Sequence, residues 1–174
     1  QKLGYQNVDF VLGEIENMPG IVDGEADVVI SNCVMNLVPD KTQAFAEVNR
    51  ILKTGAHFSI SDIVYEGVLP AGIQEAAELY AGCVAGASEK GAYLGIIKAA
   101  GFKNIQIKSE RKIELPDDLL LQYISPTQLA DFKASGSGIY SITVYADKLE
   151  DGPCCVTSDT SCCDSTVARV ASDT

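Results

Sequence analysis

The sequence has little positive charge, a single histidine and no long apolar run. It carries 13 Lys and Arg against 24 Asp and Glu, which gives a net charge of -11 over 174 residues. A fold this acidic is poorly suited to bind nucleic-acid backbones or an anionic membrane surface, so we expect neither as a partner. Its apolar stretches reach only about seven residues, which suits buried strands and is too short to span a bilayer. The histidine, His57, falls inside a predicted strand, where we expect an ordinary sheet residue.

The sequence also lacks the glycine-rich loop that nucleotide-cofactor domains place after their first strand. No G-x-G-x-x-G or similar run occurs in it. Residues 1–4 lead into no apolar run, so they do not form a signal peptide. We therefore expect the C-terminal part of such a domain, whose glycine loop and first strands would precede residue 1.

Six cysteines fall into two groups. Cys33 and Cys83 stand singly among regular elements, and the others form two adjacent pairs near the C-terminus: Cys154, Cys155, Cys162 and Cys163. A disulfide-built secreted domain would spread its cysteines through a small, loop-rich chain, so we expect reduced thiols in the cytoplasm. The adjacent pairs do not match the C-x-x-C spacing of structural zinc.

Hydrophobic periodicity predicts an open α/β sheet over residues 1–148. The predicted strands are 8–12, 26–30, 56–62, 104–108 and 138–145, and the predicted helices begin near residues 40, 73, 88 and 125. The strand at 26–30 is apolar throughout, as in strands buried on both faces. Strand, helix and strand joined by short links predict a parallel crossover, and the last two strands should pair with each other.

Further predictions concern helix ends and two longer segments. Asp40 should cap the first helix, with Gln43 three positions on, and Gly55 should end that helix. Ser88 should cap the third helix. We expect a small α+β insertion at about 102–138 and a disordered, acidic, Cys-rich tail at 149–174.

Open α/β sheets bind ligands outside the carboxyl ends of their strands. Glu14 and Ile15 follow the first predicted strand, and Asn32 ends the second. A carboxylate at Glu14 can accept hydrogen bonds from a ribose hydroxyl or an adenine amino group, while Ile15 can pack on a flat base. Surface acids after strands are common, however, so an ordinary solvated Glu14 remains the alternative.

Several motifs give the sequence a family resemblance. Residues 13–19 (Gly-Glu-Ile-Glu-Asn-Met-Pro) and 26–37 resemble the class I S-adenosylmethionine-dependent methyltransferases. Three segments look more narrowly like arsenite methyltransferases: Ser-Asn-Cys-Val at 31–34, Ile-Ser-Asp-Ile-Val at 60–64 and Tyr-Ala-Gly-Cys-Val-Ala-Gly-Ala at 80–87.

The resemblance implies a Rossmann-like methyltransferase sheet, parallel with an antiparallel last strand, and S-adenosylmethionine as cofactor. It implies that Cys33 and Cys83 together hold trivalent arsenic, the atom that receives the methyl group. Glu14 stands where the family usually has an aspartate that contacts the adenine.

The chemistry suits these residue types. Trivalent arsenic is thiophilic and carries its own lone pair, so it needs thiolate ligands and no general base. The protein would contribute the alignment of two bound reactants.

Alternatives stay open at this stage. Single cysteines often pack as small hydrophobes, in which case the chain would be a methyltransferase of a small organic acceptor. A third hypothesis is a soft-metal or metalloid-binding protein without catalysis, with the four tail thiols as ligands. An incomplete sheet would also expose an edge beside the second strand, through which copies of the chain could associate.

Overall fold

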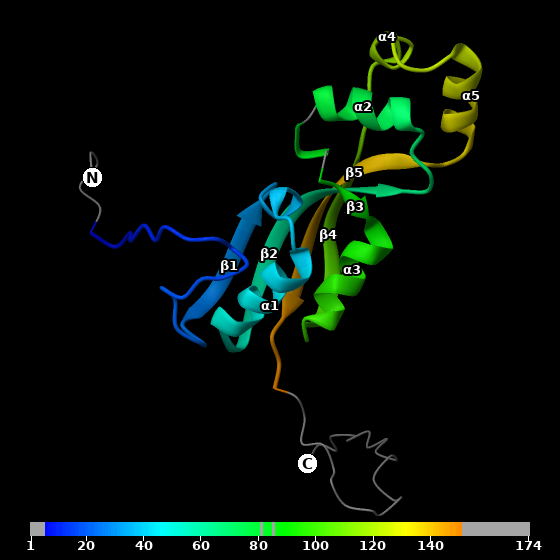
Figure 1. The fold of residues 1–174 in the computed structure, drawn as a ribbon. Coiled ribbons are helices and arrows are strands. Elements are labelled where there is room, and N and C mark those ends of the chain that lie inside the picture. The colour runs from blue at the N-terminus through cyan, green and yellow to red at the C-terminus, as the bar shows by residue number, and fades with distance from the viewer. Residues whose placement is uncertain (1–5, 81, 85, 151–174) are drawn as a thin grey trace, which may run out of the picture.

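The structure, a computed structural model, describes residues 6–80, 82–84 and 86–150. One mixed sheet organises them (Figure 1), with the strand order β1-β2-β5-β4. β1 (Ala26–Asn32) runs parallel to β2 (Leu52–Glu66), and β5 (Gly138–Asp147) lies antiparallel between β2 and β4 (Lys103–Ile113). The short β3 (Ser88–Glu89) pairs with the far end of β2. The predicted Rossmann-like sheet with an antiparallel last strand is confirmed.

The crossover from β1 to β2 contains α1 (Lys41–Ile51). Its cap is the predicted one, since the Gln43 N–H donates to the Asp40 carboxylate at 3.0 Å. The prediction that Gly55 ends the helix is wrong. β2 already begins at the fully buried Leu52, and Gly55 lies inside this long strand with a φ of 83°.

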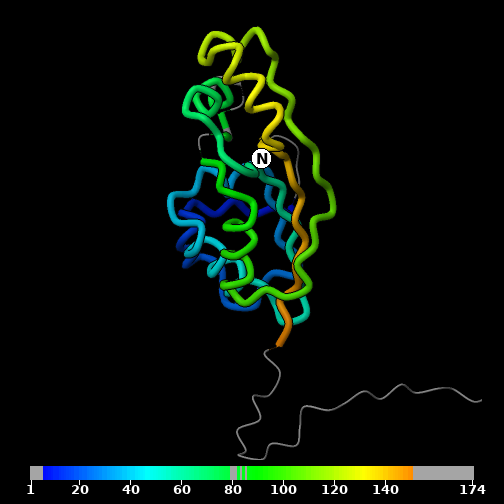
Figure 2. Tube along the Cα trace, turned by 90° about the vertical axis from the view of Figure 1, so that its right-hand side faces the viewer, coloured from blue at the N-terminus to red at the C-terminus, as the bar shows by residue number. Residues whose placement is uncertain are grey.

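The main core lies between the sheet and two helices on one of its faces, α1 and α3 (Lys90–Ala99) (Figure 2). Phe45 of α1 stacks edge-on against Tyr93 of α3, with ring centroids 5.6 Å apart. Phe58 of β2 meets Phe102 in the same way at 4.7 Å. The helix α3 is capped by Glu89 and not by Ser88 as predicted, because Ser88 is extended and pairs with Val64.

Two strand predictions near the N-terminus are wrong. Residues 8–12 form no strand, and Phe10 and Leu12 are 94% and 102% exposed. A strand needs a neighbour for its N–H and C=O groups, and no described residue pairs with this segment. β1 is likewise not buried on both faces: Val28 and Ile30 are exposed, since α1 and α3 cover only the other face.

A second group of helices, called here the helical cap, lies beyond the carboxyl end of β2 (Figure 1). It consists of α2 (Ala71–Tyr80), α4 (Asp117–Leu120) and α5 (Pro126–Ala134), with an apolar cluster of its own. The helix start at Ser125-Pro126 is confirmed by a reciprocal capping box with Gln128. The expected α+β insertion therefore divides into two parts. β4 belongs to the main sheet, and the residues between β4 and β5 carry the helices α4 and α5.

Two 3-10 turns complete the fold, η1 (Met35–Leu37) after β1 and η2 (Gly82–Val84) after α2. No helix in the described ranges is long and apolar enough to cross a membrane. The expected disordered tail lies almost entirely outside the described residues.

Candidate functional site

Cys33 lies where the chain leaves β1 at its carboxyl end. Its backbone N–H donates to Ser61 O of β2 at 2.8 Å, and its thiol donates to Asn32 Oδ1 at 3.6 Å. Its φ of 59° is in the left-handed region, which non-glycine residues rarely adopt. The half-buried Cys33 is therefore held by the neighbouring strand in an unusual backbone conformation, at the edge of the sheet where open α/β folds bind ligands.

The segment that carries Cys83 lies against the segment that carries Cys33. The evidence is Gly86, where an added Cβ would lie 1.8 Å from Asn36 O and 2.8 Å from its carbonyl carbon. No side chain fits there, so the backbone that follows η2 is pressed directly on η1. Cys33 is three residues before Asn36, and Cys83 is three before Gly86. The structure thus brings the two cysteine-bearing loops together, while the side chain of Cys83 is not among those described.

A buried carboxylate lies beneath this contact. Asp62 of β2 is 1% exposed, and its Oδ2 accepts a hydrogen bond of 2.6 Å from the Tyr93 hydroxyl. Burial raises the pKa of Asp62 to about 6, although the bond from Tyr93, the backbone N–H of Asn36 and the charge of Lys41 each act to lower it. Burial and the nearby Asp62 charge raise the pKa of Tyr93, so its hydroxyl remains a donor. Sequence reasoning noted Asp62 as a strand end and assigned it no role.

Glu14 and Ile15 lie in a tight turn, in which the Asn17 N–H donates to Glu14 O at 3.1 Å. Glu14 is exposed, and Ile15 packs on the main core. A shallow pocket of about 140 Å³ opens beside them, lined by residues 11–15 and 18–21. The predicted contact of Glu14 and Ile15 with adenosine stays a prediction.

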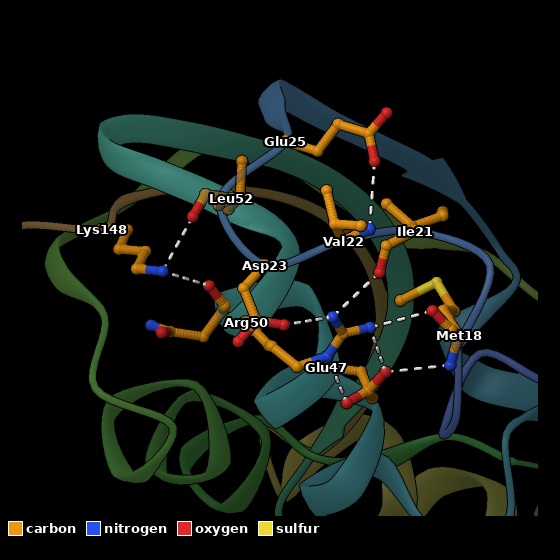
Figure 3. A network of polar contacts seen from close by, with 10 residues as sticks. Met18, Ile21, Val22, Asp23, Glu25, Glu47, Arg50, Leu52 and Lys148 are labelled. Atoms are coloured by element: carbon orange, nitrogen blue, oxygen red, sulfur yellow. Dashed lines mark hydrogen bonds and ion pairs between the residues drawn. The ribbon is translucent and has the colours of Figure 1, made fainter.

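An ion pair on α1 holds the chain that follows this turn (Figure 3). Arg50 binds both oxygens of Glu47 at 2.9 Å and also donates to Met18 O, Ile21 O and the Asp23 carboxylate. Glu47 in turn accepts the Met18 N–H at 2.9 Å. These bonds lower the pKa of Glu47 and raise that of Arg50, so both stay charged. Segment 18–23 is therefore fastened to α1, which fixes one wall of the pocket.

The remaining candidates are more dispersed. Asn32 is exposed at the end of β1, next to Cys33. His57 is a sheet residue whose ring packs on Tyr145 at 4.9 Å. Cys154, Cys155, Cys162 and Cys163 lie outside the described residues, and within the described ones no group of three or more His, Cys, Asp or Glu side chains could hold a metal ion.

A family model for a methyltransferase domain matches residues 1–101. The chain belongs to this methyltransferase family. The matched residues are 101 of the 174, which is more than half of the chain.

Curated relatives extend the match beyond that domain model. The arsenite methyltransferase of Halobacterium salinarum is 36% identical over 143 residues, which cover 82% of this chain and 34% of the relative. The arsenite methyltransferase of Aquipseudomonas alcaligenes is 30% identical over 152 residues, or 86% of this chain and 41% of the relative. The chain therefore spans well under half the length of either protein.

Solved structures agree on the fold. The arsenic(III) S-adenosylmethionine methyltransferase of Chlamydomonas reinhardtii superposes with a TM-score of 0.66 at 30% identity, covering 85% of this chain and 46% of that one. The YcgJ protein of Bacillus subtilis superposes with a TM-score of 0.63 at 16% identity, which shows the fold alone.

Proposed function

We propose that this chain carries the arsenic-binding part of an arsenite methyltransferase, which transfers a methyl group from S-adenosylmethionine to thiol-bound trivalent arsenic. The observation that carries the proposal is the contact between Gly86 and Asn36, because it brings the loops of Cys33 and Cys83 together at the ligand-binding edge of the sheet. The names of the relatives support the same substrate.

Two thiolates suit trivalent arsenic, a soft centre that carboxylates and imidazole bind poorly. Cys33 is presented by the end of β1 and Cys83 by η2, so the arsenic would be held between a sheet edge and the segment above it. The lone pair of arsenic is itself the nucleophile, which removes the need for a general base. The task of the protein is then to hold the arsenic atom in line with the methyl donor.

The residues present fit the adenosine part of the cofactor. Glu14 offers an exposed carboxylate to N–H or O–H donors, Ile15 offers apolar surface, and the pocket beside them is open. Asn32, next to Cys33, is the third residue we assign to this site. When bound, S-adenosylmethionine supplies an electrophilic methyl group, whose bond to sulfur breaks with the electron pair left on sulfur. The chain's own contribution is to hold that donor at the edge where Cys33 lies.

The proposal has consequences for location and assembly. Arsenite or its thiol conjugates bind only reduced cysteines, so a reducing compartment such as the cytoplasm is required. In the described part of the chain, β1 also has no neighbour on its outer edge. Self-association through this edge is a further prediction.

The test is a calorimetric titration of the reduced chain with arsenite. The four tail cysteines are first changed to serine, which gives a tail-serine chain whose cysteines are Cys33 and Cys83 alone. We expect one arsenite to bind per chain, and either Cys33→Ser or Cys83→Ser to abolish tight binding. Binding that needs the tail thiols instead would favour a metalloid-binding protein without catalysis. An absence of arsenite binding by the intact chain would favour an organic acceptor.

A further inference from the structure

The backbone carbonyl of Asn36 lies where α1 and the loop that follows η2 meet η1. Asn36 is 2% exposed, and its carbonyl oxygen accepts a hydrogen bond of 3.2 Å from Lys41 Nζ. The same carbonyl is the atom against which Gly86 packs. Three residues earlier, the backbone N–H of Cys33 donates to Ser61 O at 2.8 Å, and Ser61 directly precedes Asp62 in β2. The position of the segment from Cys33 to Asn36 therefore depends on β2 and sets the position of the loop that follows η2.

Asp62 is an unexpected residue for the core. Its neighbours on the same face of β2, Ile60 and Val64, are fully buried and apolar. Burying a carboxylate costs free energy, and an apolar side chain would fill the site without that cost. Packing alone therefore does not account for an acid at this position, next to the residue whose carbonyl holds Cys33.

Tyr93 fixes the carboxylate from the helix side. Its hydroxyl bonds Asp62 Oδ2 at 2.6 Å, and its ring is locked edge-on against Phe45. Tyr93 is fully buried, so this bond is shielded from water. Tyr93 and Asp62 thus tie α3 to β2 at the residue next to Ser61, whose carbonyl accepts the N–H of Cys33.

We propose that Asp62 and Tyr93 are positioning residues that set the separation between Cys33 and Cys83. They act through the neighbouring Ser61, whose carbonyl holds the N–H of Cys33. The segment that begins at Cys33 carries Asn36, which contacts Gly86, itself three residues from Cys83. The identity of the ligand rests on the proposed function, but the separation of the two thiols can be measured without arsenic.

The experiment uses the tail-serine chain and a bifunctional bimane reagent that joins two nearby thiols. The rate at which Cys33 and Cys83 become joined is followed by peptide mass spectrometry. Tyr93→Phe removes only the hydroxyl and keeps the ring in its packing. Tyr145→Phe is the matched control, since Tyr145 makes the same kind of bond, 2.6 Å to Asp147 Oδ1, toward the opposite end of the sheet.

We expect Tyr93→Phe to slow the joining reaction by at least about tenfold, because small displacements strongly affect reactions between two positioned groups. Tyr145→Phe should leave the rate unchanged. Asp62→Asn serves as a second variant of the same shape, in case Tyr93→Phe unfolds the chain, and it should slow the reaction in the same way. Reactivity of Cys33 alone toward a monofunctional maleimide should change little in either variant.

Equal joining rates in the parent chain, Tyr93→Phe and Asp62→Asn would overturn the proposal, and so would a parent chain in which the two thiols do not join at all. A rate that depends on Tyr93 in a chain that binds no arsenite would support the positioning role and refute the proposed ligand. The two claims therefore fail separately.

Discussion

The backbone at Gly86 packs on the carbonyl group of Asn36 with no space for even a methyl group between them. Gly86→Ala must therefore separate the two loops or displace η1. We expect it to weaken arsenite binding to the tail-serine chain by at least about tenfold and to cost about 1–3 kcal/mol of stability, as overpacking does. Calorimetry and urea unfolding measure the two effects.

Gly82 gives the control for this substitution. It lies in the same loop, and nothing lies within 4 Å of the Cβ it would acquire. Gly82→Ala should bind arsenite as the parent chain does. A similar loss of affinity in both variants would show that the loop tolerates no substitution, and that the contact with Asn36 has no special part in binding.

Asp62 gives the chain a pH dependence of defined sign. Its pKa is raised from 3.8 to about 6 in the folded state, so between these values the folded chain holds a proton that the unfolded chain has released. The free energy of unfolding therefore falls as pH rises from about 4 to about 6, and is constant above that. The groups facing the carboxylate are Tyr93, the N–H of Asn36 and the charge of Lys41.

Asp62→Asn should remove this dependence. The stability of the variant relative to the parent should grow by up to about 3 kcal/mol between pH 4 and pH 7, which is the equivalent of the shift in pKa. Urea unfolding at several pH values measures it. Parallel profiles for the two chains would contradict the account. A variant that is more stable at pH 7 yet joins its thiols slowly would separate positioning from stability.

Arg50 fastens segment 18–23 to α1, and its loss leaves the largely buried Glu47 without a partner. We expect Arg50→Ala to lower the Tm by at least about 4 °C and to expose this segment to proteases. Lys53→Ala breaks an exposed pair with Asp27 and should change the Tm by less than about 2 °C. Equal effects of the two substitutions would show that the Arg50 network is ordinary surface charge.

Substitution of Glu14 should weaken cofactor binding and leave arsenic binding unchanged. In a protein that also carries the glycine loop expected before residue 1, Glu14→Ala is expected to weaken binding of S-adenosylhomocysteine by about tenfold or more, since hydrogen bonds to a charged group contribute about 1.5–3 kcal/mol. Arsenite binding should stay the same. Glu16→Ala, two positions on, is the matched control, and an equal loss there would remove Glu14 from the adenosine site.

The sequence was sufficient to predict those elements whose structure is decided by residues close together along the chain. The caps at Asp40 and Ser125 follow from side chains three residues from their partners, and the strand at 26–30 follows from its composition. The strand prediction failed at residues 8–12, which form a short apolar run but have no described strand paired with them. Strand formation depends on such a partner as much as on propensity.

The buried contacts of the site could not be predicted from the sequence, for a different reason. Asp62 and Tyr93 are 31 residues apart, and Met18 and Glu47 are 29 apart, so nothing local to either residue indicates its partner. The pair Cys33 and Cys83 came from the family resemblance. The contact between Asn36 and Gly86, which brings their loops together, was visible only once the chain was folded.

The central claim is that Cys33 and Cys83 hold the same arsenic atom. Arsenic K-edge X-ray absorption of arsenite bound to the tail-serine chain tests it most directly, with a phosphine reductant so that all sulfur around arsenic comes from the protein. The account predicts two sulfur neighbours per arsenic, falling to one in Cys33→Ser and to one in Cys83→Ser. A single sulfur neighbour in the parent chain, or two that survive either substitution, would contradict it.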